Sequence, residues 1–306
     1  MISRPFSSWR ALRNLPENSK RLLLLQRNCW RSIQKNADYH CLRAIVYGRQ
    51  ALGADILSKL GLARRIKKEA ETALQLKPDH VEARLVLIEY YRLAPGIAGG
   101  DKNKACSLAE EVAKLDPVRG YIAQAALAHQ EEKNERVEEL YRKAVEADPQ
   151  SYDALITLAR SYFNRPQSHV ELAQKYASDA LKLDSGRIAA YSLFAQSYAL
   201  QGRWQELADI LDQAEKNVPD NLNPYFQAGR AVFRQGKDYA RAECYFRKYL
   251  TQDPEPSSAS HAQAYWRLGQ TLEKLNRKAE AVEAMKTALK LDRGLKGATK
   301  ELKRLL

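Results

Sequence analysis

The side chains best suited to chemistry are five histidines and four cysteines, and both sets are scattered along the chain. No two histidines have the HExxH spacing that places a pair of imidazoles on one helix face to bind zinc. No two cysteines have the C-x-x-C spacing of a zinc or thiol–disulfide site. We therefore expect no metal site, no cofactor, no enzyme activity, and free buried thiols. The set comprises His40, His80, His129, His169, His261, Cys29, Cys41, Cys106 and Cys244.

A glycine-rich turn, Gly96–Gly100, is the next candidate for chemistry, because backbone N–H groups before a helix can bind phosphate. The turn lacks the GxxxxGK[ST] spacing of a nucleotide-binding loop, and no predicted strand precedes it. We interpret it as five extra residues in a turn between two helices. Asp101 is then the expected N-cap of a helix that runs through Ala105 to Ala113.

The elements that position these residues recur along the chain. Helix-ending dipeptides follow amphipathic runs at intervals of 39, 32, 36, 34, 35 and 39 residues. Most of them contain proline, which lacks an N–H and disfavours helix in the residue before it. The dipeptides are Lys77-Pro78, Asp116-Pro117, Asp148-Pro149, Asp184-Ser185, Val218-Pro219, Asp253-Pro254 and Asp292-Arg293. Such a period predicts a repeat of two helices.

Small residues recur between these stops, where two helix axes approach closely. They include Ala159, Ala173 and Ala180, then Ala195, Gly202 and Ala214, then Gly229, Gly236 and Ala242, then Gly269, Ala281 and Ala288. Over residues 78–293 this pattern resembles the tetratricopeptide repeat. The resemblance implies an all-α, right-handed α-solenoid of about seven antiparallel helix pairs over residues 37–293, with a C-terminal capping helix over 294–306.

Residues 39–165 also resemble a narrower group of bacterial tetratricopeptide repeat proteins of unsettled function, many of them exported. The resemblance is carried by Tyr47-Gly48-Arg49, Gly61-Leu62-Ala63, Tyr90-Tyr91, Ala94–Gly100 and Leu115-Asp116-Pro117. The run Leu22–Leu25 is shorter than the apolar core of a secretory signal. We expect a cytoplasmic protein, with organelle targeting or export as alternatives.

The charge of the chain is uneven. The formal net charge is +13, and residues 1–50 hold ten basic side chains against two acidic ones. Residues 1–36 form a basic segment in which Leu22, Leu25, Cys29 and Ile33 fall on one helical face. Three interpretations stay open: the segment caps the solenoid, it is a targeting peptide, or it binds a membrane surface or an acidic partner. We expect no transmembrane helix, because no uncharged stretch approaches about 20 residues.

The resemblance implies that the second, fifth, ninth and twelfth positions of each first helix face a ligand groove. Aromatic and arginine side chains stand out there, and both are frequent in binding hot spots. The candidate groove residues are Arg160, Phe163, Gln196, Asn223, Phe226, Arg230, Phe233, Trp266 and Gln270. The clamp of Lys and Asn found in chaperone-binding members is absent, since Ile156, Arg160, Ser192 and Gln196 occupy its positions.

The first hypothesis is a non-catalytic scaffold that binds a peptide segment of an unidentified protein. Arg160 and Arg230 would bind carboxylates, and Phe226, Phe233 and Trp266 would bind apolar side chains. The alternative is an RNA-binding helical-repeat protein, suggested by the overall charge and the repeat length. Residues 51–306 hold 40 basic and 35 acidic side chains, a balance that disfavours phosphate binding.

Overall fold

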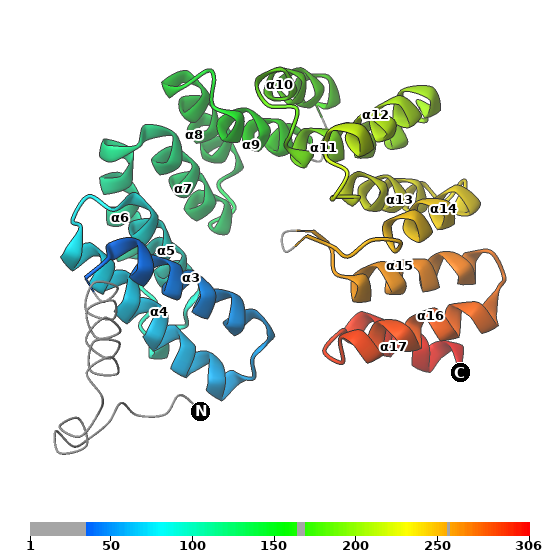
Figure 1. Ribbon diagram of the computed structural model, residues 1–306, viewed down its shortest axis with the longest axis horizontal. Coiled ribbons are helices and arrows are strands. Elements are labelled where there is room, and N and C mark those ends of the chain that lie inside the picture. Colours follow the sequence, from blue (N-terminus) through cyan, green and yellow to red (C-terminus); the bar gives the residue numbers. More distant parts are fainter. Residues whose placement is uncertain (1–34, 164–168, 256–257) are drawn as a thin grey trace, which may run out of the picture. The chain divides into compact units, whose positions relative to one another are not determined.

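The computed structural model describes residues 35–163, 169–255 and 258–306, and in these ranges every regular element is a helix. The basic segment therefore lies almost wholly outside the described residues. The chain divides into two compact units: unit 1, Met1–Leu140, and unit 2, Tyr141–Leu306. In each unit, successive helices run antiparallel and lie side by side (Figure 1).

The helices form seven successive pairs among the described residues, followed by one terminal helix, as the sequence predicts. The predicted stops at Lys77, Asp116, Asp148, Asp184 and Asp292 each come directly after the last residue of a second helix. Unit 1 contains α3 (Ala37–Gly53), α4 (Ile56–Leu76), α5 (Val81–Leu93), the 3-10 helix η1 (Gly96–Ala98), α6 (Lys102–Leu115), α7 (Pro117–Gln130) and the first part of α8 (Asn134–Ala147). Unit 2 continues with α9 (Tyr152–Phe163), α10 (Val170–Leu183), α11 (Ile188–Gln201), α12 (Trp204–Asn217), α13 (Asn223–Gln235), α14 (Tyr239–Tyr249), α15 (His261–Lys274), α16 (Lys278–Leu291) and α17 (Lys296–Leu305).

The glycine-rich turn of unit 1 has the structural role that the sequence predicts. Its eight residues between α5 and α6 exceed by five the three residues between α13 and α14. The Asp101 carboxylate caps α6 by accepting from the backbone N–H groups of Asn103 and Lys104, at 3.0 and 3.2 Å. The Tyr90 hydroxyl donates to the Ala98 carbonyl and holds the turn against α5. These contacts account for the motif without a phosphate.

Unit 2 is packed around aromatic residues. The Phe246 ring of α14 is fully buried, and a Cβ added to Gly229 of α13 would lie only 2.9 Å from that ring. In the next pair, Gly269 of α15 leaves room for the buried side chain of Met285 in α16. A small residue on one helix therefore admits a large residue from its partner, as the repeat pattern requires.

Candidate functional site

The nine candidate groove residues all lie in unit 2, on the first helices of four pairs: α9, α11, α13 and α15. The structure gives them different surroundings. Some are core residues, some bind other parts of the chain, and a few remain exposed.

Phe163 and Phe226 belong to the core. Their exposed fractions are 7% and 4%. The Phe226 ring packs 5.2 Å from the Tyr249 ring and 5.8 Å from the Phe246 ring, measured between centroids. Neither phenylalanine offers the open apolar surface that a partner side chain would need.

Trp266 and Gln270 bind the terminal helix α17. The Trp266 indole N–H donates to Glu301 at 2.8 Å, and the Gln270 amide donates to the other Glu301 oxygen at 2.7 Å. Any Cβ at Gly297 would collide with the Trp266 ring, so glycine allows α17 to lie against it. The predicted capping helix therefore covers the candidate positions of α15.

Three further candidates are partly buried or make contacts within the fold. The Asn223 amide donates to the Ser192 hydroxyl at 3.0 Å and links α13 to α11. Phe233 is half-buried, with its ring 5.7 Å from the Tyr239 ring. Gln196 is half-buried on α11. These residues leave only part of each side chain for a ligand.

The arginines are the candidates that remain accessible. Arg160 and Arg230 are exposed, and neither forms an ion pair within the part of the chain that the structure describes. The Arg230 guanidinium lies 5.9 Å from the centroid of the Phe226 ring and donates to Gln227 at 3.3 Å. Arg230 therefore keeps most of its hydrogen-bonding capacity.

A further arginine, Arg267 of α15, was not among the sequence candidates. It is half-buried, lies 4.7 Å from the Trp266 ring centroid, and donates to Gln270 at 2.9 Å. Burial lowers the pKa of Arg267 from its ordinary value, and the nearby positive charge of Arg230 lowers it further, while the Glu301 carboxylate of α17 partly offsets both effects. Arg230 and Arg267 thus form an arginine pair of like charges on the first helices of two neighbouring repeats. Arg267 sits one position beyond the groove register, so no sequence signal selected it.

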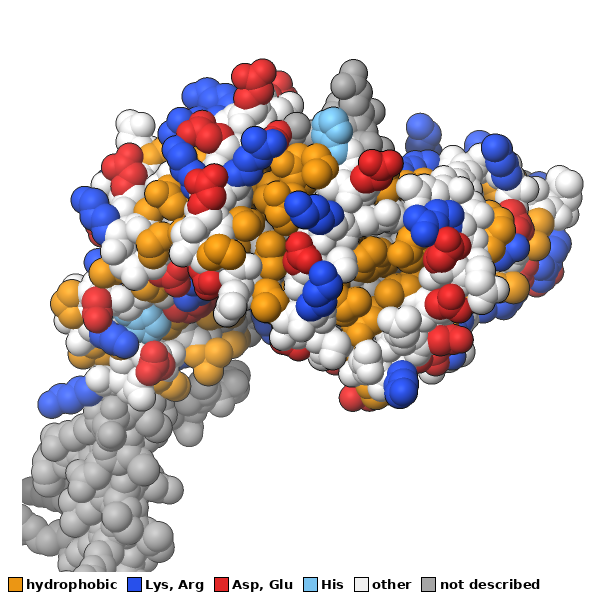
Figure 2. All heavy atoms as spheres, turned by 90° about the horizontal axis from the view of Figure 1, so that it is seen from above, with side chains coloured by type: hydrophobic (Ala, Val, Ile, Leu, Met, Phe, Trp, Pro, Cys, Tyr) orange, Lys and Arg blue, Asp and Glu red, His pale blue; other side chains and the backbone are white. Residues whose placement is uncertain are grey.

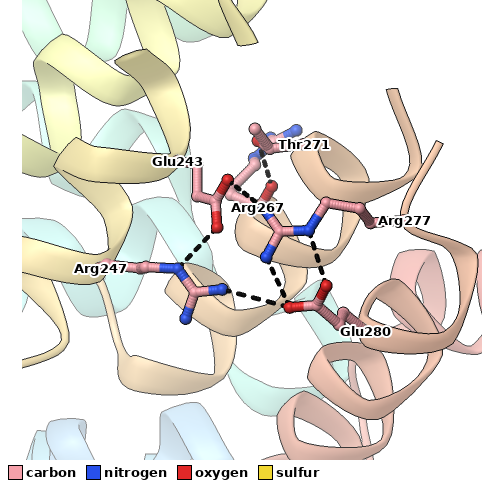
Figure 3. Close-up of polar contacts among 6 residues, drawn as sticks. All are labelled: Glu243, Arg247, Arg267, Thr271, Arg277 and Glu280. Atoms are coloured by element: carbon pink, nitrogen blue, oxygen red, sulfur yellow. Dashed lines mark hydrogen bonds and ion pairs between the residues drawn. The ribbon is translucent and has the colours of Figure 1, made fainter. Parts of the chain in front are cut away.

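On the second helices of the same repeats, by contrast, charged side chains form ion pairs with one another. Glu243 of α14 accepts from Arg247 at 2.7 Å and from Arg277 at 2.6 Å, and Glu280 of α16 accepts from Arg277 at 2.6 Å (Figure 3). The hydrogen bond from Arg277 lowers the pKa of Glu280. Arg247 of α14 and Arg277, the N-cap of α16, are thus paired with carboxylates, whereas neither Arg230 nor Arg267 forms an ion pair among the described residues.

Unit 1 contains a different feature, an apolar pocket of about 590 Å³ between α3, α4, α5 and the glycine-rich turn. Small side chains such as Ala44, Ala63 and Ala98 line much of it. Its acidic residues are already paired, Glu82 with Arg119 and Glu89 with Arg92. The pocket is therefore suited to apolar groups.

No group of three or more metal-binding side chains occurs in the described ranges. Cys41 is buried, but Cys106 and Cys244 are exposed, so the expectation of buried thiols is wrong for these two. Their helix positions face solvent. Cys29 lies outside the described residues. Among the helices of the described ranges, none combines the length and apolar character needed to cross a membrane.

Comparisons with known proteins agree with this architecture. Residues 262–294, which span α15 and α16, match the family model described as tetratricopeptide repeat. No curated protein sequence matches the chain.

Several solved structures share the fold at low sequence identity. A tetratricopeptide repeat protein from Parabacteroides merdae is 16% identical, with a TM-score of 0.54, and the match covers 86% of this chain and 99% of that one. Yeast Tom70 is 14% identical, with a TM-score of 0.58, over 88% of this chain and 58% of its own. A monomeric mutant of IFIT1 with Gppp-AAAA is 16% identical, with a TM-score of 0.56, over 80% of this chain and 59% of its own. The chain therefore has the tetratricopeptide repeat fold, and residues 262–294 form a repeat that the family model itself matches.

Proposed function

We propose that the protein is a non-catalytic scaffold whose unit 2 binds an acidic segment of a partner protein at the arginine pair. The observation that carries this proposal is the absence of any carboxylate paired with Arg230 or Arg267 within the described residues. Other arginines of unit 2, such as Arg187, Arg277 and Arg304, do form ion pairs.

Physical chemistry favours a carboxylate ligand at this place. Two like charges close together, one of them half-buried, repel each other more strongly than they would in water. A carboxylate placed between them would offset that repulsion and accept bidentate hydrogen bonds from a guanidinium. The half-buried ring of Phe233 on α13 would add apolar contact beside the charges.

The test compares charge reversal at the pair with charge reversal elsewhere. Arg230→Glu and Arg267→Glu, made singly and together, are assayed for binding of a fluorescent glutamate-rich peptide and for partners recovered from the protein's own cells. Arg293→Glu is the matched control, because Arg293 is exposed and forms no ion pair in the described residues. We expect the double variant to lose peptide binding and at least one partner, while the control keeps both.

Retention of every partner and of peptide affinity by a folded double variant would contradict the proposal. The variant Arg160→Glu tests separately whether the ligand also contacts α9. A loss of affinity in this variant alone would place the site on α9 and away from the arginine pair.

RNA binding is the second candidate, and one comparison favours testing it, since IFIT1 with Gppp-AAAA shares the fold. On the face shown in Figure 2, however, acidic and basic side chains are interspersed among hydrophobic ones. Phosphate binding requires clustered positive charge. Filter binding of a single-stranded RNA by the full chain over a salt series decides the matter, because a steep salt dependence abolished by Arg230→Glu would favour RNA.

A further inference from the structure

The apolar pocket of unit 1 has the size of a small-molecule site. Its volume of about 590 Å³ falls within the range of roughly 300–1,000 Å³ in which ligand pockets occur. The helices α3, α4 and α5 lie side by side, and each presents one stripe of side chains to the pocket (Figure 1). Small residues in these stripes leave the space open, namely Ala44, Gly48, Ala51 and Ala63. A Cβ added to Gly48 would meet no atom within 4 Å, so an apolar group can enter without displacing a helix.

The edge of the pocket is apolar as well. Leu93 of α5 lines the pocket and is 64% exposed, and Ile97 of the neighbouring glycine-rich turn is 89% exposed. Covering exposed side chains of this kind with an apolar molecule is favourable, because it removes apolar surface from water. The pocket and its edge together suit a hydrocarbon chain.

The charged residues of the lining leave one positive charge without a partner. Glu82 and Glu89 line the pocket, but each is paired with an arginine of unit 1. Lys59 of α4 also lines the pocket, is exposed, and forms no ion pair among the described residues. The hydroxyl of Tyr90 already donates to a backbone carbonyl of the glycine-rich turn. A ligand that complements this lining is therefore apolar along most of its length and carries a negative charge at one end.

The helix that supplies this lysine is basic over the stretch that lines the pocket. Leu60, Ala63 and Ile66 of α4 contribute to the lining. Residues 56–68 of the same helix hold five cationic side chains and no acidic one, which are Lys59, Arg64, Arg65, Lys67 and Lys68. Of these five, Lys67 alone has an ion pair in the described part of the chain, with Glu71 at 3.7 Å. The positive field of α4 therefore attracts anions towards the pocket.

We propose that the unit 1 pocket binds the hydrocarbon chain of a fatty acid or a similar single-chain carboxylate, with Lys59 pairing the carboxylate at the edge. Burial of the chain supplies the affinity, and the ion pair fixes its orientation and selects an acidic headgroup. A pocket of this volume matches one drug-sized molecule, which is why the ligand has a single chain. The site uses residues of unit 1 alone, so it goes beyond the peptide site proposed for unit 2 and does not depend on it.

The first experiment fills the pocket. Binding of decanoate to the full chain is measured by isothermal titration calorimetry at concentrations where decanoate is monomeric. We expect Gly48→Leu to weaken binding about tenfold or more, because the added side chain occupies the space of the ligand. Gly61→Leu is the matched control, since Gly61 lies on α4, also has no atom within 4 Å of an added Cβ, and is not part of the lining. Equal decanoate affinity in folded Gly48→Leu and Gly61→Leu variants would overturn the proposal, as would the absence of decanoate binding by the unmutated protein.

The second experiment reverses the charge at the edge and leaves the space of the pocket unfilled. Lys59→Glu should weaken decanoate binding about threefold or more and should strengthen binding of decyltrimethylammonium, which has the same chain and the opposite charge. Lys114→Glu of α6 is the control, because Lys114 is exposed, lies outside the lining and forms no ion pair in the described residues. Equal effects of Lys59→Glu on the two amphiphiles would contradict the pairing of Lys59 with the carboxylate.

A membrane surface is the competing explanation for the basic stretch of α4. Cosedimentation with vesicles of phosphatidylglycerol and phosphatidylcholine distinguishes the two. Vesicle binding that is unchanged by Gly48→Leu, in a protein that does not bind decanoate, would overturn the proposal and assign the cations of α4 to anionic lipid headgroups. Decanoate binding that Gly48→Leu abolishes, without vesicle binding, would support the pocket as the site.

Discussion

The two units build the same helical hairpin with different side chains at the crossing. In unit 1, α3, α4, α5 and the glycine-rich turn surround a pocket of about 590 Å³, which alanines line together with larger apolar side chains such as Ile45 and Leu85. In unit 2, aromatic rings such as Phe226, Phe246 and Tyr249 pack together in the core. The comparison indicates that the repeat pattern sets the path of the backbone, while the side chains where neighbouring helices meet decide how fully the space between the helices is filled.

A large effect is expected from Phe246→Ala in unit 2. The ring is fully buried against α13, and its removal leaves a cavity that the neighbouring helices fill only in part. We expect a loss of about 3–5 kcal/mol in the free energy of unfolding. Leu85→Ala in unit 1 is the comparison variant, because Leu85 borders an existing pocket and should cost clearly less. Both variants are measured by urea denaturation. Equal losses in the free energy of unfolding would contradict the predicted difference between the units.

Glycine substitutions should have opposite signs in the two units. A Cβ at Gly229 would meet the Phe246 ring, and overpacking of this kind costs about 1–3 kcal/mol. A Cβ at Gly48 of α3 meets no atom within 4 Å, so Gly48→Ala should gain up to ~1 kcal/mol from helix propensity. Thermal unfolding monitored by circular dichroism gives both signs. A destabilised Gly48→Ala variant would show that the pocket is less open than described.

The smallest expected effect is a difference between the units in alkaline solution. Burial raises the pKa of Cys41 in unit 1 to about 11 and that of Tyr249 in unit 2 to about 12. In the unfolded chain these groups lose their protons near pH ~8.5 and ~10. Between the unfolded and folded values only the unfolded chain is deprotonated, so stability falls as pH rises through each window.

We therefore expect Cys41 to weaken unit 1 at a lower pH than Tyr249 weakens unit 2. Cys41→Ala should flatten the decline in stability between about pH 9 and 11, and Tyr249→Phe the decline between about pH 10 and 12. Urea titrations across this range test the order. If the pH dependence of stability is the same in both variants as in the unmutated protein, Cys41 and Tyr249 do not cause the decline in stability.

Much of the fold could be predicted because its signals are local. A proline or aspartate at a helix end acts on its own turn, and a small residue at Gly229 or Gly269 marks a crossing wherever the repeat places it. The five extra residues of the glycine-rich turn were also visible in the sequence. The candidate site was less predictable, since Phe226 and Trp266 share the same repeat position yet one is buried and the other is bound to α17.

The sequence by itself determined the helical repeat, its approximate boundaries and the concentration of positive charge before α3. Only the tertiary structure decided which arginines lack a partner, because Arg277 meets Glu243 and Arg304 meets Glu273 across 34 and 31 residues of chain. The tertiary structure likewise decided that α3, α4 and α5 of unit 1 surround a pocket, and that aromatic rings of α13 and α14 in unit 2 pack into a core. The physical reason is that helix formation depends on neighbours along the chain, whereas charge pairing and cavity volume depend on side chains brought together from different repeats.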